Sequence, residues 1–126
     1  MTDAGALMHG KRGLVMGVAN DRSIAKRVRP LADSLGSTMV LPCDVTDPAS
    51  IDAAFDAIET EWGGLDFVVH AIAYSDKDEL KGRYVDTSPE NFAMTMNISC
   101  YSFTAICKRA VPLMKNGGSL VTLTYA

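Results

Sequence analysis

The sequence has 126 residues, of which 48% are hydrophobic and 21% are charged, with a formal net charge of −3. This length suffices for one buried core and is too short for two, so we expect a single domain over residues 1–126. The weak acidity excludes an electrostatic footprint for nucleic acid, and no apolar run is long enough to span a bilayer. The three cysteines lack metal-ligand spacing, which indicates reduced core cysteines, no metal site and a cytoplasmic location.

Four short apolar runs predict β-strands in chain order: residues 13–17, 38–42, 66–71 and 119–124. Each run is almost continuously apolar, and helical patterns lie between them. This alternation favours an α/β fold with a parallel sheet covered on both faces. Ligands of such sheets bind outside the carboxyl ends of the strands, so the residues that follow each strand are the candidate site.

The turn after the first predicted strand carries Gly17 and Ser23. Glycine allows a tight turn, and a helix that begins at Ser23 offers free N–H groups and a positive dipole end to a pyrophosphate. The stretch lacks the G-x-G-x-x-G spacing that is typical of dinucleotide-binding proteins. These residues alone therefore fit an ordinary strand-to-helix turn as well as a pyrophosphate site.

Two helices are predicted from their ends. Asp47 caps the first, which has Pro48 at its first position and ends at residues 63–64; its apolar face consists of Ile51, Ala54, Phe55, Ile58 and Trp62. Ser88 caps a second helix that runs towards Met114. Its apolar surface covers more than one stripe, so we expect it to pack against both the sheet and a neighbouring subunit.

Small or polar residues follow the predicted strands. Asp44 either accepts a hydrogen bond from an adenine amine, with the Val45 backbone beside the ring, or is a turn or capping residue. The small residues 71–73 allow close approach of a ribose or nicotinamide, and they equally suit helix packing. For His70 we expect bonds to backbone, because no Cys, Asp or Ser partner is evident. The phenol of Tyr125 could donate a proton or simply pack.

Five segments, in order, carry a family resemblance: GVANDRSIA, LPCDVTD, DFVVHAIAYSDKDELKGRYVDTS, NISCYSFTA and GGSLVTLTY. Together they closely resemble the NADH-dependent enoyl-acyl carrier protein reductases of bacterial type II fatty-acid synthesis, which belong to the short-chain dehydrogenase/reductase superfamily. That family spaces its glycine and serine as Gly17 and Ser23 stand here. The resemblance implies a Rossmann-like, doubly wound parallel sheet, of which this chain holds the incomplete N-terminal half.

The resemblance also implies roles for individual residues. Six of them would hold NAD: Gly17, Ser23, Ile24, Asp44, Val45 and Ile72. The first three would line the pyrophosphate and ribose, the next two the adenine, and the last the nicotinamide. Tyr74 and Ser75 fall at the mouth of the acyl pocket, and Tyr125 matches the first of two active-site tyrosines, the catalytic residue in this part of the chain.

The implied reaction is hydride transfer from NADH to the β-carbon of a trans-2-enoyl thioester on acyl carrier protein. Negative charge then develops on the thioester oxygen, where a phenol and the ribose hydroxyl can stabilise it. The family's enzymes are homotetramers, so the resemblance implies the same assembly here.

Two departures from the family leave other interpretations open. The family places a helix, a strand and a loop between the segments that are joined directly here at residues 25–26, and a merged helix over 24–35 would contain Pro30, which argues against an unbroken helix. The family's second tyrosine and its lysine partner are also absent. The alternatives are an inactive truncated Rossmann fragment with weak or no nucleotide binding, or a superfamily reductase that acts on a ketone or alcohol.

Overall fold

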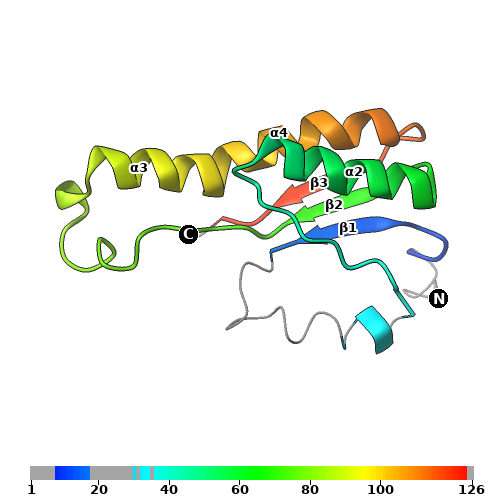
Figure 1. Cartoon of the computed structure of the whole chain (residues 1–126), viewed down its shortest axis with the longest axis horizontal. Coiled ribbons are helices and arrows are strands. Elements are labelled where there is room, and N and C mark those ends of the chain that lie inside the picture. The colour runs from blue at the N-terminus through cyan, green and yellow to red at the C-terminus, as the bar shows by residue number, and fades with distance from the viewer. Residues whose placement is uncertain (1–7, 18–29, 31, 35, 125–126) are drawn as a thin grey trace, which may run out of the picture.

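The fold is built on a three-stranded parallel sheet (Figure 1). A computed structural model describes residues 8–17, 30, 32–34 and 36–124. The strands are β1 (Gly13–Met16), β2 (Phe67–His70) and β3 (Ser119–Thr122), and they lie in the order β1-β2-β3. In the register of the sheet, Met16 lies opposite His70, and His70 lies opposite Thr122. The predictions of a parallel sheet and of these three strands are confirmed.

Helix α2 (Pro48–Trp62) forms as its end signals predict. The Asp47 carboxylate accepts a hydrogen bond from the Ala49 N–H at 3.0 Å. At the other end Gly63 adopts a left-handed conformation with φ 66°, and its N–H donates to the Glu59 carbonyl at 2.8 Å. Both ends are therefore satisfied by residues within or next to the helix, which explains why the sequence alone predicts its bounds.

The predicted second helix is a continuous helical rod with one irregular turn. It consists of α3 (Pro89–Met96), a π-helical turn (Asn97–Tyr101), α4 (Ser102–Ala110) and a short 3₁₀ turn (Val111–Leu113). Ser88 caps it as predicted, because its Oγ accepts from the N–H of the third residue along at 3.1 Å. The π-helical turn is a feature that the apolar pattern does not reveal.

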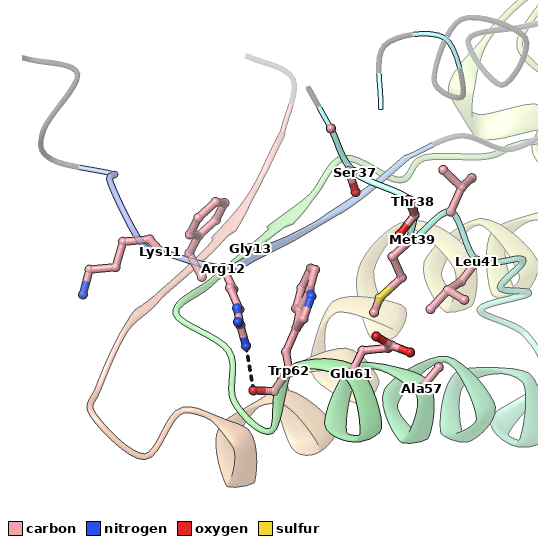
Figure 2. Close-up of a pocket in the computed structure, with 13 residues that line it drawn as sticks. Lys11, Arg12, Gly13, Ser37, Thr38, Met39, Leu41, Ala57, Glu61 and Trp62 are labelled. Carbon is pink, nitrogen blue, oxygen red and sulfur yellow. Dashed lines mark hydrogen bonds between the residues drawn. The ribbon is translucent and has the colours of Figure 1, made fainter. Parts of the chain in front are cut away.

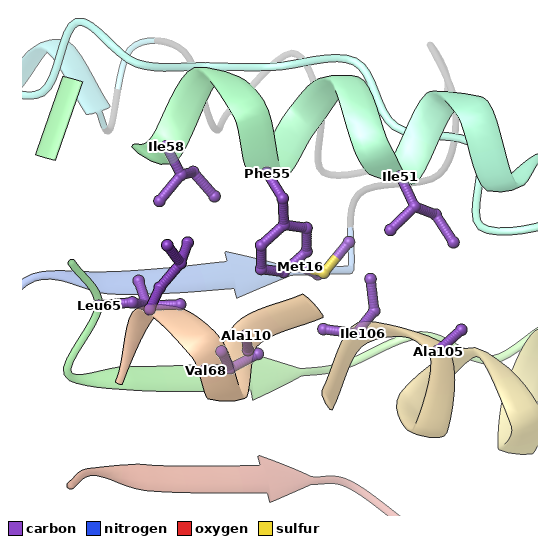
Figure 3. Packing of buried hydrophobic residues seen from close by; sticks show 10 residues of the cluster. Met16, Ile51, Phe55, Ile58, Leu65, Val68, Ala105, Ile106 and Ala110 are labelled. Atoms are coloured by element: carbon purple, nitrogen blue, oxygen red, sulfur yellow. The ribbon is translucent and has the colours of Figure 1, made fainter. Parts of the chain in front are cut away.

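The hydrophobic core lies between the sheet and the helices α2 and α4 (Figure 3). Phe55 and Ile58 of α2 point towards the sheet. They belong to the same buried cluster as Val68 of β2 and Ile106 of α4. Ile58, Val68 and Ile106 are completely buried. Burial of one such side chain stabilises a fold by about 1.5–3 kcal/mol, so this cluster is the main source of its stability.

Helices α2 and α4 lie on one face of the sheet, and α3 continues the rod beyond the carboxyl ends of the strands (Figure 1). On the other face Val15 and Val121 are 68% and 46% exposed. Residues 30 and 32–34 are helical, and the turn at 32–34 lies on that second side in Figure 1. The rest of the merged helix considered over 24–35 falls outside the described residues.

The predicted strand at 38–42 does not form, and this expectation was wrong. Among the described residues β1 pairs with β2 alone, so its other edge has no strand beside it. A cavity of about 670 Å³ lies between the segment 36–41, the beginning of β1 and the last turns of α2 (Figure 2). The segment 38–42 is apolar, but no described strand lies beside it. A strand is stabilised by hydrogen bonds to a neighbouring strand, so the apolar pattern alone does not produce one here.

Candidate functional site

The carboxyl ends of β1 and β2 approach each other closely at Gly17. The Ala71 N–H donates to the Met16 carbonyl at 2.9 Å, which extends the pairing of the two strands by one residue. Gly17 has φ 146°, and a Cβ there would overlap the Ala71 carbonyl oxygen. Only glycine fits this backbone. Gly17, which is predicted to line a pyrophosphate, therefore leaves the backbone at the end of β1 uncovered by a side chain, and we call this place the glycine cradle.

Asp44 is an exposed carboxylate held in a rigid turn. Its Oδ1 accepts hydrogen bonds from the N–H and the hydroxyl of Thr46 at 2.9 and 2.7 Å, and these bonds lower the pKa of Asp44. Its own N–H donates to Ser50 Oγ at 2.8 Å. Within the described residues Oδ2 has no hydrogen-bond partner and is open to a ligand. The turn interpretation and the adenine interpretation are therefore compatible, and the second stays a prediction.

Val45 and Ile72 have a structural role whatever they bind. Both are half-buried and pack against the core cluster beneath the sheet ends. Neither can move far without disturbing that core, so the backbone beside each is firmly placed. The contacts of the described residues bring Gly17 next to residue 71, one position before Ile72, but no hydrogen bond links Asp44 to either strand end.

Tyr74 and Ser75 belong to the segment after β2 that lies along the helical rod. The Tyr74 side chain is 52% exposed, while its backbone N–H and carbonyl both bond to Ser99 Oγ, at 2.9 and 3.0 Å. Ser75 Oγ accepts from Asn91 Nδ2 at 3.2 Å and from Thr95 Oγ1 at 2.9 Å. The two residues predicted at the acyl pocket are thus neighbours in one fixed segment.

An apolar groove of about 420 Å³ lies beside this segment. Its apolar lining comes from the loop after β2 and from α3, and consists of Leu80, Tyr84, Phe92 and Met96. The loop is held by Glu79, whose carboxylate accepts from the N–H and the hydroxyl of Ser88 at 2.8 and 2.7 Å. The groove shares Ser75 with the predicted substrate site, so the two are continuous.

His70 is completely buried, and its bonds differ from those expected. Its ring nitrogens contact Thr122 Oγ1 at 2.9 Å and Ser102 Oγ at 2.7 Å, not the backbone. Ser102 donates its own proton to the Ile98 carbonyl at 2.6 Å, so its oxygen accepts from His70 Nε2–H, and His70 Nδ1 accepts from Thr122. Burial lowers the pKa of His70, which therefore stays neutral and links β2, β3 and the helical rod.

The helical residues that make these contacts were not predicted from the sequence. They lie at positions 91, 95, 99 and 102, spaced by four, four and three residues. Such spacing places polar side chains on one face of a helix, and that periodicity is the signal that could have revealed them.

Three predicted site residues lie outside the described residues: Ser23, Ile24 and Tyr125. The backbone leading to the last of them is nevertheless placed, because the Leu123 N–H donates to the His70 carbonyl at 3.2 Å. The chain therefore reaches the carboxyl end of β2 two residues before Tyr125.

The described part of the chain contains three cysteines and no metal-binding cluster. Cys43 and Cys107 are half-buried, but Cys100 is exposed, so the expectation of three core cysteines was wrong. All three are free thiols. Across the described ranges no group of three or more His, Cys, Asp or Glu side chains could hold a metal ion. In the same ranges no helix is both long and apolar enough to cross a membrane.

The parallel sheet, its glycine cradle and the polar residues at the strand ends define an α/β dinucleotide-binding type of fold. The family model described as enoyl-(acyl carrier protein) reductase matches residues 4–126. This chain belongs to the enoyl-(acyl carrier protein) reductase family.

Individual relatives agree with that membership. The chain is 55% identical to enoyl-[acyl-carrier-protein] reductase [NADH] 1 of Rhizobium meliloti, over 99% of this chain and 55% of the relative. It is 45% identical to the FabI reductase of Rickettsia felis, over 94% of this chain and 55% of that protein. A solved enoyl reductase of Anaplasma phagocytophilum in complex with NAD superposes with a TM-score of 0.85 at 52% identity, covering 94% of this chain and 55% of its own.

The chain spans about half the length of the curated relatives that it matches. The alignment with the R. meliloti enzyme covers 149 positions, whereas the chain has 126 residues, so at least 23 positions of the alignment have no counterpart here. This shortfall agrees with the internal helix-and-strand unit found missing in the sequence, and with the open edge of β1.

Proposed function

We propose that this chain is the dinucleotide-binding half of an NADH-dependent enoyl-acyl carrier protein reductase of fatty-acid synthesis, folded as one domain over 1–126. The observation that carries the proposal is the close approach of the β1 and β2 ends at Gly17, where a Cβ would overlap Ala71. This side-chain-free cradle lies at the carboxyl edge of a parallel sheet, where ligands of such folds bind. The names of the matched relatives supply the reaction.

NADH would be held along that edge by the six residues proposed for it: Gly17, Ser23, Ile24, Asp44, Val45 and Ile72. The described residues fit such a ligand, because the cradle admits a phosphate group close to backbone and Asp44 offers an ionised oxygen to an adenine amine. The cofactor, when bound, supplies a hydride. Ile72 would form one wall beside the nicotinamide.

The substrate would be a trans-2-enoyl thioester carried by acyl carrier protein. Tyr74 and Ser75 would form the mouth of its pocket, and the apolar groove that Ser75 shares would accept part of the acyl chain. Tyr125 would donate a hydrogen bond to the thioester oxygen, because a phenol placed there stabilises the negative charge that develops.

A homotetramer and a cytoplasmic location complete the proposal. Outside the groove, the helical rod exposes Tyr101 and Val111 by 61% and 59%, and exposed apolar side chains of this kind support burial against a second copy. Sedimentation would test this, since a monomer at high concentration would contradict it. The three free thiols support a reducing compartment.

The test is NADH binding by the chain and by Asp44→Asn, measured by the fluorescence of the bound nicotinamide. Asparagine keeps an oxygen for Thr46 and so preserves the turn, but it replaces the ligand-facing carboxylate oxygen with an amide. Loss of a charge-assisted hydrogen bond is expected to weaken binding by about 1 kcal/mol or more. The matched control is Asp56→Asn on the exposed face of α2, which should leave binding unchanged.

The competing function is an inactive Rossmann fragment with weak or no nucleotide binding. The edge of β1 that has no strand beside it in the described part of the chain favours it, because unpaired backbone groups at a sheet edge indicate an incomplete fold. A folded chain that shows no NADH binding would support the fragment, and equal binding by Asp44→Asn and the unmodified chain would reduce Asp44 to a turn residue. Consumption of NADH with a crotonyl thioester would support the reductase.

A further inference from the structure

Four polar residues form a line along the inner face of the helical rod: Asn91, Thr95, Ser99 and Ser102. We call them the polar seam. Asn91 and Ser102 are 7% and 0% exposed, although buried positions on a helix are usually apolar. Each member of the seam bonds to the segment that follows or ends β2, so the seam acts on one stretch of chain.

The first two members of the seam hold the far part of that segment. Asn91 Oδ1 accepts from the Asp76 N–H at 2.9 Å, and its Nδ2 donates to Ser75 Oγ at 3.2 Å. Thr95 Oγ1 donates to the same serine oxygen at 2.9 Å. Ser75 is therefore oriented by two donors from the rod, and its own place in the segment follows from the placement of the rod.

Ser99 holds the middle of the segment by two bonds to a single residue. Its Oγ accepts from the Tyr74 N–H at 2.9 Å and donates to the Tyr74 carbonyl at 3.0 Å. One hydroxyl thus satisfies both backbone groups of Tyr74, which have no strand to pair with beyond β2. Removal of this hydroxyl would leave both groups to find water or to shift.

The π-helical turn makes this arrangement possible. It spans Asn97–Tyr101 and is centred on Ser99. A π-helical turn widens the helix by one residue and re-aims the side chains beyond it, and such turns are frequent at functional sites. Ser102, which follows the turn, accepts from His70 at 2.7 Å and donates to the Ile98 carbonyl within it at 2.6 Å. Ser99 and Ser102 therefore contact the same stretch of chain at two points, Tyr74 and His70.

We propose that Ser99 is a positioning residue for the acyl thioester: through the Tyr74 backbone it fixes the segment 74–76 that forms the mouth of the acyl pocket. This inference rests on the proposed function. The rod anchors the segment through hydrogen bonds from hydroxyl and amide groups. Because hydrogen bonds are directional, they fix the orientation of the segment as well as its distance from the rod. Both of these hydrogen bonds of Ser99 Oγ go to the Tyr74 backbone. Its effect on thioester binding is therefore indirect and acts through the placement of Tyr74 and Ser75.

The first test compares Ser99→Ala with Ser99→Thr, which keeps the hydroxyl, and with Thr104→Ala, which removes an exposed hydroxyl from the same rod. Amide hydrogen exchange of Tyr74 is measured in each chain. Ser99→Ala is expected to exchange about tenfold faster at Tyr74, because the acceptor of that N–H is lost. Ser99→Thr should restore slow exchange, and Thr104→Ala should leave it unchanged.

The second test measures ligand binding with crotonyl coenzyme A in the presence of NAD⁺, and with NADH alone. Ser99→Ala is expected to weaken crotonyl coenzyme A binding about five- to tenfold while NADH binding changes less than twofold. Ser99→Thr should recover the thioester affinity. A residue that served stability alone would lower the affinities for both ligands together, in proportion to the loss of folded protein.

The outcomes separate this inference from the proposed function. Unchanged Tyr74 exchange in Ser99→Ala, or equal loss of both ligands, would overturn the positioning role while the reductase assignment stands. Failure of the unmodified chain to bind either ligand would overturn the proposed function, and with it the role of Ser99 in substrate binding. The exchange of the Tyr74 amide would still decide whether Ser99 holds the backbone.

Discussion

Two segments that flank the sheet have similar composition but differ in structure. The segment 71–76 after β2 is bonded to the helical rod at residues 74–76, whereas the segment 36–41 before α2 borders an open cavity and forms no strand (Figure 2). Both contain small and apolar residues. The first has a partner surface with matching donors and acceptors, and the second has no strand beside it among the described residues.

The difference shows that regular structure depends on a partner as much as on the local sequence. Residues 38–42 have the apolar pattern of a strand, but a strand is stabilised by pairing across a ladder. Residues 74–76 have no strand pattern, yet side chains of the rod bond to the backbone of Tyr74 and Asp76. The segment after β2 is accordingly held by hydrogen bonds, whereas a cavity lies beside the beginning of β1.

The largest effect is expected at the packed side, from Ile106→Ala. Ile106 is 0% exposed and touches both α2 and the sheet through the core cluster. Its truncation should lower the free energy of unfolding by about 2–5 kcal/mol, as for other buried aliphatic residues. Urea denaturation measures this, and a loss below about 1 kcal/mol would contradict the assignment of this cluster as the main core.

The next effect is expected from Gly17→Ala, where the two strand ends meet. A methyl group would strain the φ of 146° and overlap the Ala71 carbonyl, so the free energy of unfolding should fall by about 3 kcal/mol. Gly36→Ala is the matched control, since Gly36 has φ 71° but nothing near a Cβ, and it should lose only about 1 kcal/mol. Equal losses at the two positions would contradict the close approach of β1 and β2.

The link between the sheet and the rod is expected to weaken in acid through His70. Its pKa is lowered in the folded chain by burial, so the unfolded chain binds the proton first. The free energy of unfolding should therefore be highest above about pH 6.5 and fall as the pH decreases from there through the folded pKa, by up to about 1.4 kcal/mol per pH unit. Denaturation from pH 7.5 downwards tests this against His70→Gln, which cannot titrate and should lack this part of the slope.

The smallest effect is expected at the open side, from Leu41→Ala. Leu41 lines the cavity and is 38% exposed, so its truncation removes few contacts and should lower the free energy of unfolding by less than about 1 kcal/mol. The comparison with Ile106→Ala is the direct measure of the asymmetry. A loss at Leu41 as large as at Ile106 would mean that the segment packs as tightly as a core strand.

The sequence predicts the features that are decided locally. The bounds of α2 follow from Asp47 and Gly63, and Ser88 marks the start of the rod, because caps act within a few residues. The partners of His70 could not be predicted in this way, since Ser102 and Thr122 lie 32 and 52 residues away in the sequence. The π-helical turn likewise depends on contacts that form only after the rod meets β2.

The candidate site likewise contains residues that local sequence predicts and residues that depend on distant contacts. The glycine at position 17 and the carboxylate of Asp44 could be identified from turn chemistry at the ends of apolar runs. The strand predicted at 38–42 was wrong because no strand of the described part of the chain pairs with it, and no pattern within those five residues reports this. The spacing of positions 91, 95, 99 and 102 could have shown that Ser99 shares a polar face of the rod, but its bonds to the Tyr74 backbone depend on the segment that this face meets.

The most direct test of the account is a titration of the isotope-labelled chain with NADH, followed by amide chemical-shift changes in NMR spectra. We expect the largest changes at Gly17 and Ile72, at the carboxyl edge of the sheet, and at Asp44 and Val45, with little change at residues 36–41 beside the cavity. Absence of change at the first set, or change confined to the second, would contradict the proposal that this edge of the sheet binds NADH.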